Sequence, residues 1–128
     1  MKDVPKDPQS GAVRRGLRLL VIEDDPETLQ LMLEMLELMG HWATGVKSAE
    51  LAMARYLDGA FDIVLTDVGL PALSGLDLAQ TLIERHGARI VFATGRSQPE
   101  TLLPGTVWLP KPFGADRLQD AIDQALAL

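Results

Sequence analysis

Short apolar runs alternate with segments of helical periodicity along most of this chain, and this alternation constrains the fold more than any other feature. The runs expected to be strands are 17–22, 42–46, 61–66, 89–93 and 106–109, and the expected helices are 26–39, 48–57, 75–86 and 115–126. Strands that are apolar along their whole length are typical of a parallel sheet covered by helices on both faces. Right-handed crossovers then limit the topology to a few doubly wound orders. The sequence therefore predicts a three-layer α/β fold on a doubly wound sheet of five parallel strands.

The segment 26–39 shows how clearly a helix boundary is marked. Asp25 is a residue type that caps helix N-termini, and Pro26 suits the first helical position because no N–H is needed there. Glu27 adds negative charge to the first turn, and Gly40 follows the expected end. These signals predict a helix that begins shortly after the first strand.

Length and composition fit one compact domain. The chain has 128 residues, of which 47% are hydrophobic, so it can bury one sizeable core. Its net charge of -6 disfavours non-specific binding to nucleic acid, which is itself a polyanion. Cysteine is absent, which excludes disulfides and thiolate metal sites and makes the reducing cytoplasm the expected compartment. No apolar stretch is long enough for membrane insertion as a spanning helix.

Residues 1–16 differ in composition from the rest of the chain. They are rich in Pro, Gly and basic residues and lack apolar periodicity, which predicts a flexible leader or linker. They also lack the apolar segment of a secretory signal. We therefore expect the folded domain to occupy residues 17–128.

Charged and hydroxyl side chains stand where the expected strands end. Glu23 and Asp24 follow the first strand, Asp67 the third, Thr94 the fourth and Lys111 the fifth. In a doubly wound sheet, reactive groups gather at the carboxyl ends of the strands. Each residue alone has an ordinary explanation, and Asp67 is also a common residue type at turns. Their occurrence together favours a shared site.

The acidic members of this set favour a bound metal ion. Three carboxylates in one site repel one another unless a cation lies among them. Oxygen ligands without His or Cys are those preferred by Mg²⁺. The negative charges of Glu23, Asp24 and Asp67 would be balanced by Mg²⁺ together with Lys111. The pattern predicts a Mg²⁺ site in which Asp67 is a metal ligand or a nucleophile.

Four motifs give the chain a family resemblance. They are Val-Ile-Glu-Asp-Asp-Pro at 21–26, Asp-Val-Gly-Leu-Pro at 67–71 with Gly75, Thr-Gly at 94–95, and Lys-Pro-Phe at 111–113. In this order and spacing they resemble the receiver domain of two-component response regulators, and the resemblance extends from Leu17 to the C-terminus. It implies a flavodoxin-like fold with the strand order 2-1-3-4-5.

The resemblance also implies roles for the strand-end residues. Asp67 would accept a phosphoryl group from a phosphohistidine on a sensor histidine kinase or a histidine phosphotransfer protein. Asp24, Asp67 and the Gly69 carbonyl would hold Mg²⁺. Glu23 would assist, either directly or through water. Lys111 would pair with Asp67 and then with a phosphoryl oxygen.

Thr94 would form a switch together with an aromatic residue. Its hydroxyl would bond the phosphoryl group, and in the family an aromatic near the end of the fifth strand then turns inward. The matching residue here is Trp108, which is larger than the usual Tyr or Phe, so a half-buried packing role is the alternative. The peptide between Lys111 and Pro112 is expected to be cis, as in the family.

The stretch between the fourth and fifth strands departs from the family pattern. A full helix usually lies there, but Pro99, Pro104 and Gly105 would stop it within about a turn and a half. We therefore expect a shortened fourth helix and no homodimer formed through it. In this respect the chain resembles receivers attached to hybrid histidine kinases. It also ends right after its last helix, which leaves no room for a DNA-binding domain, so no direct nucleic-acid partner is expected.

The helix expected at 26–39 offers a candidate docking surface. Its core-facing stripe is expected to include Leu31 and Met35. Leu29 and Leu33 lie beyond that stripe, at an edge where receivers often carry charge. An exposed apolar edge would suit a four-helix-bundle partner such as a kinase dimerisation domain or a phosphotransfer domain. A slightly wider buried face is an equal alternative.

Two other functions are considered beside the phosphoacceptor. A hydrolase of the haloacid-dehalogenase type also uses a strand-end Asp, Mg²⁺ and Lys, but it needs a second Asp two positions after the nucleophile, where Gly69 stands. A receiver-like module that binds partners without phosphorylation would not need the complete set of acids, Thr and Lys. We expect a signalling phosphoacceptor, limited to self-phosphotransfer and self-dephosphorylation, and not an enzyme.

Overall fold

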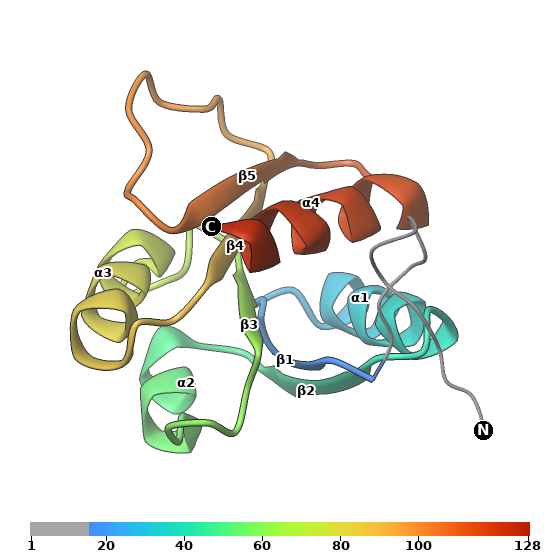
Figure 1. The fold of residues 1–128 in the computed structure, drawn as a ribbon, viewed down its shortest axis with the longest axis horizontal. Coiled ribbons are helices and arrows are strands. Elements are labelled where there is room, and N and C mark those ends of the chain that lie inside the picture. Colours follow the sequence, from blue (N-terminus) through green and yellow to red (C-terminus); the bar gives the residue numbers. More distant parts are fainter. Residues whose placement is uncertain (1–15) are drawn as a thin grey trace.

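The computed structural model describes residues 16–128, which form one sheet between two layers of helices (Figure 1). The strands are β1 (Arg18–Ile22), β2 (Trp42–Val46), β3 (Ile63–Thr66), β4 (Ile90–Thr94) and β5 (Thr106–Pro110), and the helices are α1 (Pro26–Leu38), α2 (Ala49–Arg55), α3 (Gly75–His86) and α4 (Ala115–Ala127). The strands are parallel, in the order β2-β1-β3-β4-β5. Helices α1 and α4 cover one face, and α2 and α3 the other. The predicted α/β fold and strand order are confirmed.

The element boundaries lie within two residues of those expected from the sequence. Helix α1 begins at Pro26, and the Asp25 carboxylate accepts a hydrogen bond from the Thr28 N–H at 2.9 Å, which makes Asp25 the N-cap. Helix α2 ends at Arg55, two residues early, as is common at helix ends. The leader predicted for residues 1–16 lies outside the described residues, apart from Gly16.

Between β4 and β5, where the structure describes every residue, no helix forms. Residues 95–105 run as bends and a turn and project beyond the sheet (Figure 1). Pro99 and Pro104 lack the N–H groups that a continuing α-helix needs, and Gly105 has a φ of 84°, outside the helical region. The expectation of a shortened helix is therefore confirmed, and in this chain the helix is absent.

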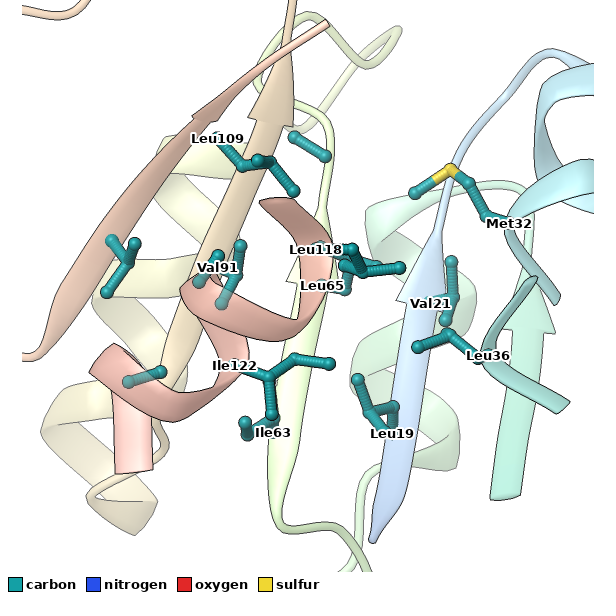
Figure 2. Packing of buried hydrophobic residues seen from close by; sticks show 14 of the residues in the cluster. Leu19, Val21, Met32, Leu36, Ile63, Leu65, Val91, Leu109, Leu118 and Ile122 are labelled. Atoms are coloured by element: carbon teal, nitrogen blue, oxygen red, sulfur yellow. The ribbon is translucent and has the colours of Figure 1, made fainter. Parts of the chain in front are cut away.

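Side chains of the strands alternate between the two faces of the sheet and form two cores. On the face of α1 and α4, the core includes Leu19, Val21, Met32, Leu36, Ile63, Leu65, Val91, Leu109, Leu118 and Ile122 (Figure 2). On the face of α2 and α3, it includes Leu20, Ile22, Val64, Leu78, Leu82, Ile90 and Phe92. Each fully buried aliphatic side chain contributes about 1.5–3 kcal/mol, so the two cores hold the strand ends in fixed positions.

A buried histidine links α4 to the residue that precedes β1. The Leu17 N–H donates to His41 Nδ1 at 3.4 Å, which leaves the proton of the neutral ring on Nε2. That Nε2 lies 3.0 Å from Gln119 Oε1 on α4 and donates to it. Both ring nitrogens are therefore used in packing the domain together, and His41 has a structural role.

The helices of residues 16–128 are short. The longest, α1 and α4, have 13 residues each. A membrane-spanning helix needs about 20 mainly apolar residues, and none of these helices is long and apolar enough to cross a bilayer.

Arg18 and Asp62 join β1 to the entry of β3, at the opposite end of the sheet from the strand carboxyl ends. The Arg18 N–H donates to Asp62 Oδ2 at 2.8 Å, and Arg18 Nη2 donates to Oδ1 at 3.1 Å. Partial burial raises the pKa of the Asp62 carboxyl, but the hydrogen bonds and charge of Arg18 outweigh it and hold the pKa below its ordinary 3.8. The contact therefore stabilises the fold above that pH and is lost as the pH falls through the lower folded-state pKa.

Asp62→Asn is expected to lower the free energy of unfolding at neutral pH and to matter less in acid. The difference from wild type should shrink as the pH falls below about 3.8, because the wild-type carboxyl then also loses its charge. Urea unfolding followed by circular dichroism at a series of pH values measures this difference. Asp120→Asn, at an exposed position of α4, is the control and should keep the wild-type pH dependence. A loss in Asp62→Asn that stays constant into acid would contradict this role of Asp62.

Candidate functional site

The carboxyl ends of β1, β3, β4 and β5 lie side by side at one edge of the sheet. Glu23 and Asp24 follow β1, Asp67 follows β3, Thr94 ends β4 and Lys111 follows β5. Because these four strands are successive neighbours, residues that are up to 88 positions apart come into contact. The structure thus brings together the residues that the sequence placed at strand ends.

Three carboxylates form the centre of this edge. Glu23, Asp24 and Asp67 each offer an oxygen, and these oxygens lie within 4.8 Å of one another. Glu23 is buried, Asp24 is exposed and Asp67 is half-buried, so the cluster opens to solvent on one side. Close carboxylates repel unless a cation separates them, and oxygen ligands at such spacing suit a hard divalent ion.

Lys111 pairs more closely with Glu23 than with Asp67. Its Nζ lies 2.5 Å from Glu23 Oε1 and 3.7 Å from Asp67 Oδ2. The other oxygen of Glu23 accepts a hydrogen bond from the Asp25 N–H at 3.1 Å. Glu23 is only 2% exposed, and a carboxylate that deep needs such partners because it has lost its water. The sequence suggested only the pair between Lys111 and Asp67.

The backbone that follows Asp67 holds its carboxylate in place. Asp67 Oδ1 accepts the N–H of Val68 at 2.7 Å and the N–H of Gly69 at 3.4 Å. Asp67 Oδ2 is therefore directed toward Lys111. A carboxylate with one oxygen held by amides and the other facing a cation is oriented for attack or for metal binding.

Gly75 allows the loop after Asp67 to close. It is the first residue of α3, and a Cβ built on it would lie 1.8 Å from the Asp67 carbonyl oxygen. Its N–H also donates to the Val68 carbonyl at 3.0 Å. No side chain fits at this position, so the close approach needs glycine. The sequence marked Gly75 as part of a motif, but it carried no signal of this steric reason.

Thr94 is linked to both neighbouring loops. Its side chain is buried, and Oγ1 accepts the N–H of Arg96 at 3.2 Å. Its carbonyl accepts the N–H of Lys111 at 2.9 Å, which joins the ends of β4 and β5. The peptide between Lys111 and Pro112 is cis, as expected.

Trp108 is half-buried beside the loop that replaces the helix. Its ring packs on Phe92, with centroids 5.6 Å apart, and its Nε1 donates to the Arg96 carbonyl at 3.2 Å. The sequence left open a switch and a packing role for this residue. In this conformation Trp108 packs on the sheet and is hydrogen-bonded to the loop at Arg96.

Comparison with known proteins places the chain in a family. The sequence model of the response regulator receiver domain matches residues 19–123, which is most of the chain. The chain is a response regulator receiver domain. Receiver domains of this family are the signalling phosphoacceptors of two-component systems, and the domain has an acidic cluster formed by Glu23, Asp24 and Asp67.

Several relatives support the assignment. The virulence sensor protein BvgS of Bordetella pertussis is 30% identical over 88% of the chain, and the sensor protein TorS of Escherichia coli is 30% identical over 98%. The chain spans only 10% and 14% of their lengths. Response regulator TrrA of Thermotoga maritima, solved with Mg²⁺ and BeF, is 26% identical, with a TM-score of 0.76 over 86% of this chain and 99% of TrrA. TrrA has also been solved in complex with the histidine kinase ThkA.

The predicted docking edge of α1 is not exposed in the receiver domain. Leu29 is 8% exposed, and Leu33 is partly buried against the same core. Both lie over Gly45 of β2, where an added Cβ would come 3.0 Å from Leu29 and 2.9 Å from Leu33. The expected exposure is wrong for Leu29, which is buried, whereas Leu33 is partly buried. Gly45 leaves room for both side chains, so the buried face of α1 is wider than its core-facing stripe alone.

A different apolar surface of α1 is exposed in the receiver domain. A groove of about 260 Å³ lies between α1 and the loop after β5. It is lined by Thr28, Leu31, Met32, Met35, Lys111, Pro112 and Phe113. Leu31, which the sequence placed in the core-facing stripe, is 63% exposed beside this groove. The groove reaches Lys111 and so adjoins the acidic site, and we call it the α1 groove.

Gly75→Ala is expected to destabilise the receiver domain by about 1–3 kcal/mol, because the new methyl group forces α3 away from the Asp67 carbonyl. Urea unfolding at neutral pH measures the loss. Gly95→Ala is the matched control, since its Cβ would meet nothing within 4 Å and its φ is ordinary. Equal stability of the two variants would show that the close approach at Gly75 is unimportant.

Proposed function

We propose that Asp67 accepts a phosphoryl group from a phosphohistidine and that phosphorylation changes how the domain binds its partners. The position of Asp67 is the observation that carries this proposal. Its carboxylate is aligned by two backbone N–H groups, lies 3.7 Å from Lys111 and stands within 4.8 Å of two further carboxylates. An anionic nucleophile beside a cation is suited to attack on a charged phosphoryl group.

The transfer exchanges one bond for another. A carboxylate oxygen of Asp67 forms a bond to phosphorus while the bond between phosphorus and the partner's imidazole nitrogen breaks. The electron pair of that bond stays on the ring nitrogen, which takes up a proton. The product is an acyl phosphate on Asp67. Lys111, whose Nζ lies 3.7 Å from Asp67 Oδ2, would pair with a phosphoryl oxygen, and the Thr94 hydroxyl would donate to another.

The donor set fits Mg²⁺. Asp24, Asp67 and the Gly69 carbonyl would hold the ion, which would supply positive charge for the phosphoryl oxygens when bound. Glu23 already accepts hydrogen bonds at both oxygens, from Lys111 and from the Asp25 N–H. It is therefore better placed to act on the ion through water than directly.

Residue 69 argues against repeated catalytic hydrolysis. A hydrolase of the haloacid-dehalogenase type needs an acid/base carboxylate two residues after its nucleophile, and Gly69 has no side chain. The guanidinium of Arg96 lies over Gly69. A guanidinium donates hydrogen bonds but does not exchange protons as a general acid or base, so Arg96 does not replace the missing carboxylate. We propose that the domain performs self-phosphotransfer and self-dephosphorylation and no other reaction.

The α1 groove is the proposed docking surface for a histidine kinase or a histidine phosphotransfer protein. It is apolar, adjoins Lys111 and would place a partner helix beside Asp67. The complex of TrrA with the kinase ThkA supports a kinase as partner, and the likeness to BvgS and TorS supports a place in a hybrid kinase. A homodimer through a helix between β4 and β5 is not proposed, because residues 95–105 form a loop. The net charge of -6 argues against nucleic acid as a partner.

Acetyl phosphate with Mg²⁺ is expected to phosphorylate the wild-type domain once per molecule, at Asp67. Intact-mass spectrometry and a phosphate-affinity gel measure the product, and phosphate release measures turnover. Asp67→Asn and removal of Mg²⁺ by EDTA should each abolish the labelling. Release of many equivalents of phosphate without accumulation of the phosphorylated domain would favour a hydrolase, and no labelling of wild type would favour a binding module that works without phosphorylation.

Leu31→Glu is expected to slow phosphotransfer from a phosphorylated kinase about tenfold or more, because it places a charge in the apolar α1 groove. Labelling by acetyl phosphate should be unchanged, since that small donor needs no docking surface. A kinase found by phosphotransfer profiling supplies the assay. Leu38→Glu is the matched control, because Leu38 is 90% exposed on the same helix but does not line the groove. Equal slowing in both variants would rule out docking in the groove.

A further inference from the structure

The Arg96 side chain occupies the space beside Gly69 where another residue would have its own side chain. It lies in the loop after β4, two residues beyond Thr94. A Cβ built on Gly69 would come 2.9 Å from Arg96 Nη2 and 3.4 Å from Arg96 Cζ. The guanidinium therefore fills the space that any larger residue at position 69 would need. Gly69 in turn stands two residues after Asp67 and donates its N–H to the Asp67 carboxylate.

The backbone of the same residue is bonded to both parts of the predicted switch. The Arg96 N–H donates to Thr94 Oγ1 at 3.2 Å, and the Arg96 carbonyl accepts the Trp108 Nε1–H at 3.2 Å. Arg96 thus contacts the edge of the phosphoacceptor loop with its side chain, and Thr94 and Trp108 with its backbone. A displacement of its guanidinium that also moves the Arg96 backbone would change the hydrogen bonds to both residues.

The Arg96 guanidinium has no carboxylate partner in the described part of the chain. Among residues 16–128 it forms no ion pair with a carboxylate, although an acidic cluster lies nearby. Lys111, by contrast, is bound to Glu23. An exposed arginine held at the mouth of the site has donors available for an incoming anion.

The charge of the phosphorylated site calls for one more cation. A phosphoryl group carries about −1.5 to −2 at neutral pH. With Glu23 and Asp24 it would bring the site to about four negative charges, whereas Mg²⁺ and Lys111 supply three positive ones. Arg96 is the cation that lies close enough to Gly69 to supply the fourth.

We propose that Arg96 binds the phosphoryl group on Asp67, with Gly69 providing the space through which its guanidinium reaches it. This inference rests on the proposed function of Asp67 as the phosphoacceptor. The planar guanidinium presents paired donors that match two phosphoryl oxygens, which a lysine cannot do. The Thr94 hydroxyl can donate to a third oxygen while it still accepts from the Arg96 N–H, because a hydroxyl has one donor and two acceptor positions.

Binding of the phosphoryl group would also reach Trp108. When the guanidinium moves toward Asp67, the Arg96 backbone shifts with it. This shift displaces the carbonyl that accepts the Trp108 Nε1–H. The indole is half-buried against Phe92, so a change in this hydrogen bond alters its surroundings and its fluorescence. In this way the loop that replaces the family helix carries the signal to the surface around Trp108.

Beryllofluoride with Mg²⁺, a phosphoryl mimic, tests the proposal by calorimetric titration. Arg96→Gln is expected to raise the dissociation constant of beryllofluoride about tenfold, the effect of one charge-assisted contact at a partly exposed site. Arg96→Lys should recover part of the loss. The affinity for Mg²⁺ alone should not fall, whereas a general disturbance of the site would lower both. Arg85→Gln, at an exposed arginine of α3, is the matched control and should bind beryllofluoride as wild type does.

Gly69→Ala provides a second, independent arm. Its methyl group would displace the guanidinium while leaving the Gly69 carbonyl in the chain, so it should weaken beryllofluoride binding as Arg96→Gln does. The double variant should be no weaker than either single variant, because both remove the same contact. Fully additive losses would overturn the assigned link between the two residues.

The outcomes separate this inference from the proposed function. If wild type binds no beryllofluoride and acetyl phosphate does not label Asp67, the proposed function fails. If wild type does both and Arg96→Gln binds beryllofluoride with wild-type affinity, only the role of Arg96 is overturned. In a Trp42→Phe background, loss of the beryllofluoride-induced fluorescence change in Arg96→Gln at saturating mimic supports the link to Trp108, and an unchanged signal contradicts it.

Discussion

The buried ion pair between Glu23 and Lys111 joins the two sides of the site. Glu23 follows β1, the neighbour of the central strand β3, where it has lost contact with water, and the cation that stabilises it comes from the loop after β5. The strands that carry Asp67 and Thr94 lie between these two partners in the sheet. The pair therefore spans the edge from β1 to β5 and keeps the phosphoacceptor and the switch residue within one arrangement of loops.

The loop of residues 95–105 gives this receiver its particular surface. In place of a helix, the chain leaves Trp108 half-buried and places Arg96 against the loop that contains Gly69. The same segment would otherwise cover this side of the sheet with regular structure. By preventing a helix, Pro99, Pro104 and Gly105 let Arg96 lie next to the phosphoacceptor loop. They also change the surface around Trp108 that a partner can contact.

Much of the fold and of the site could be predicted from the sequence, because the relevant signals are local. Apolar runs predicted the strands, and Asp25 and Pro26 marked the start of α1. Since parallel strands end at one edge, the residues at their ends were expected to meet. The exposure of Leu29 was mispredicted, because helical periodicity alone does not show that Gly45 leaves room for Leu29 and Leu33.

The sequence by itself determined the doubly wound fold, the absence of a full helix after β4 and the set of side chains at the strand ends. These follow from periodicity, from Pro and Gly, and from the order of residues along the chain. Only the tertiary structure decided that Lys111 pairs most closely with Glu23, that Leu31 is exposed and that Arg96 lies over Gly69. The physical reason is that each depends on a segment distant in the sequence, which supplies a charge or leaves or fills a space.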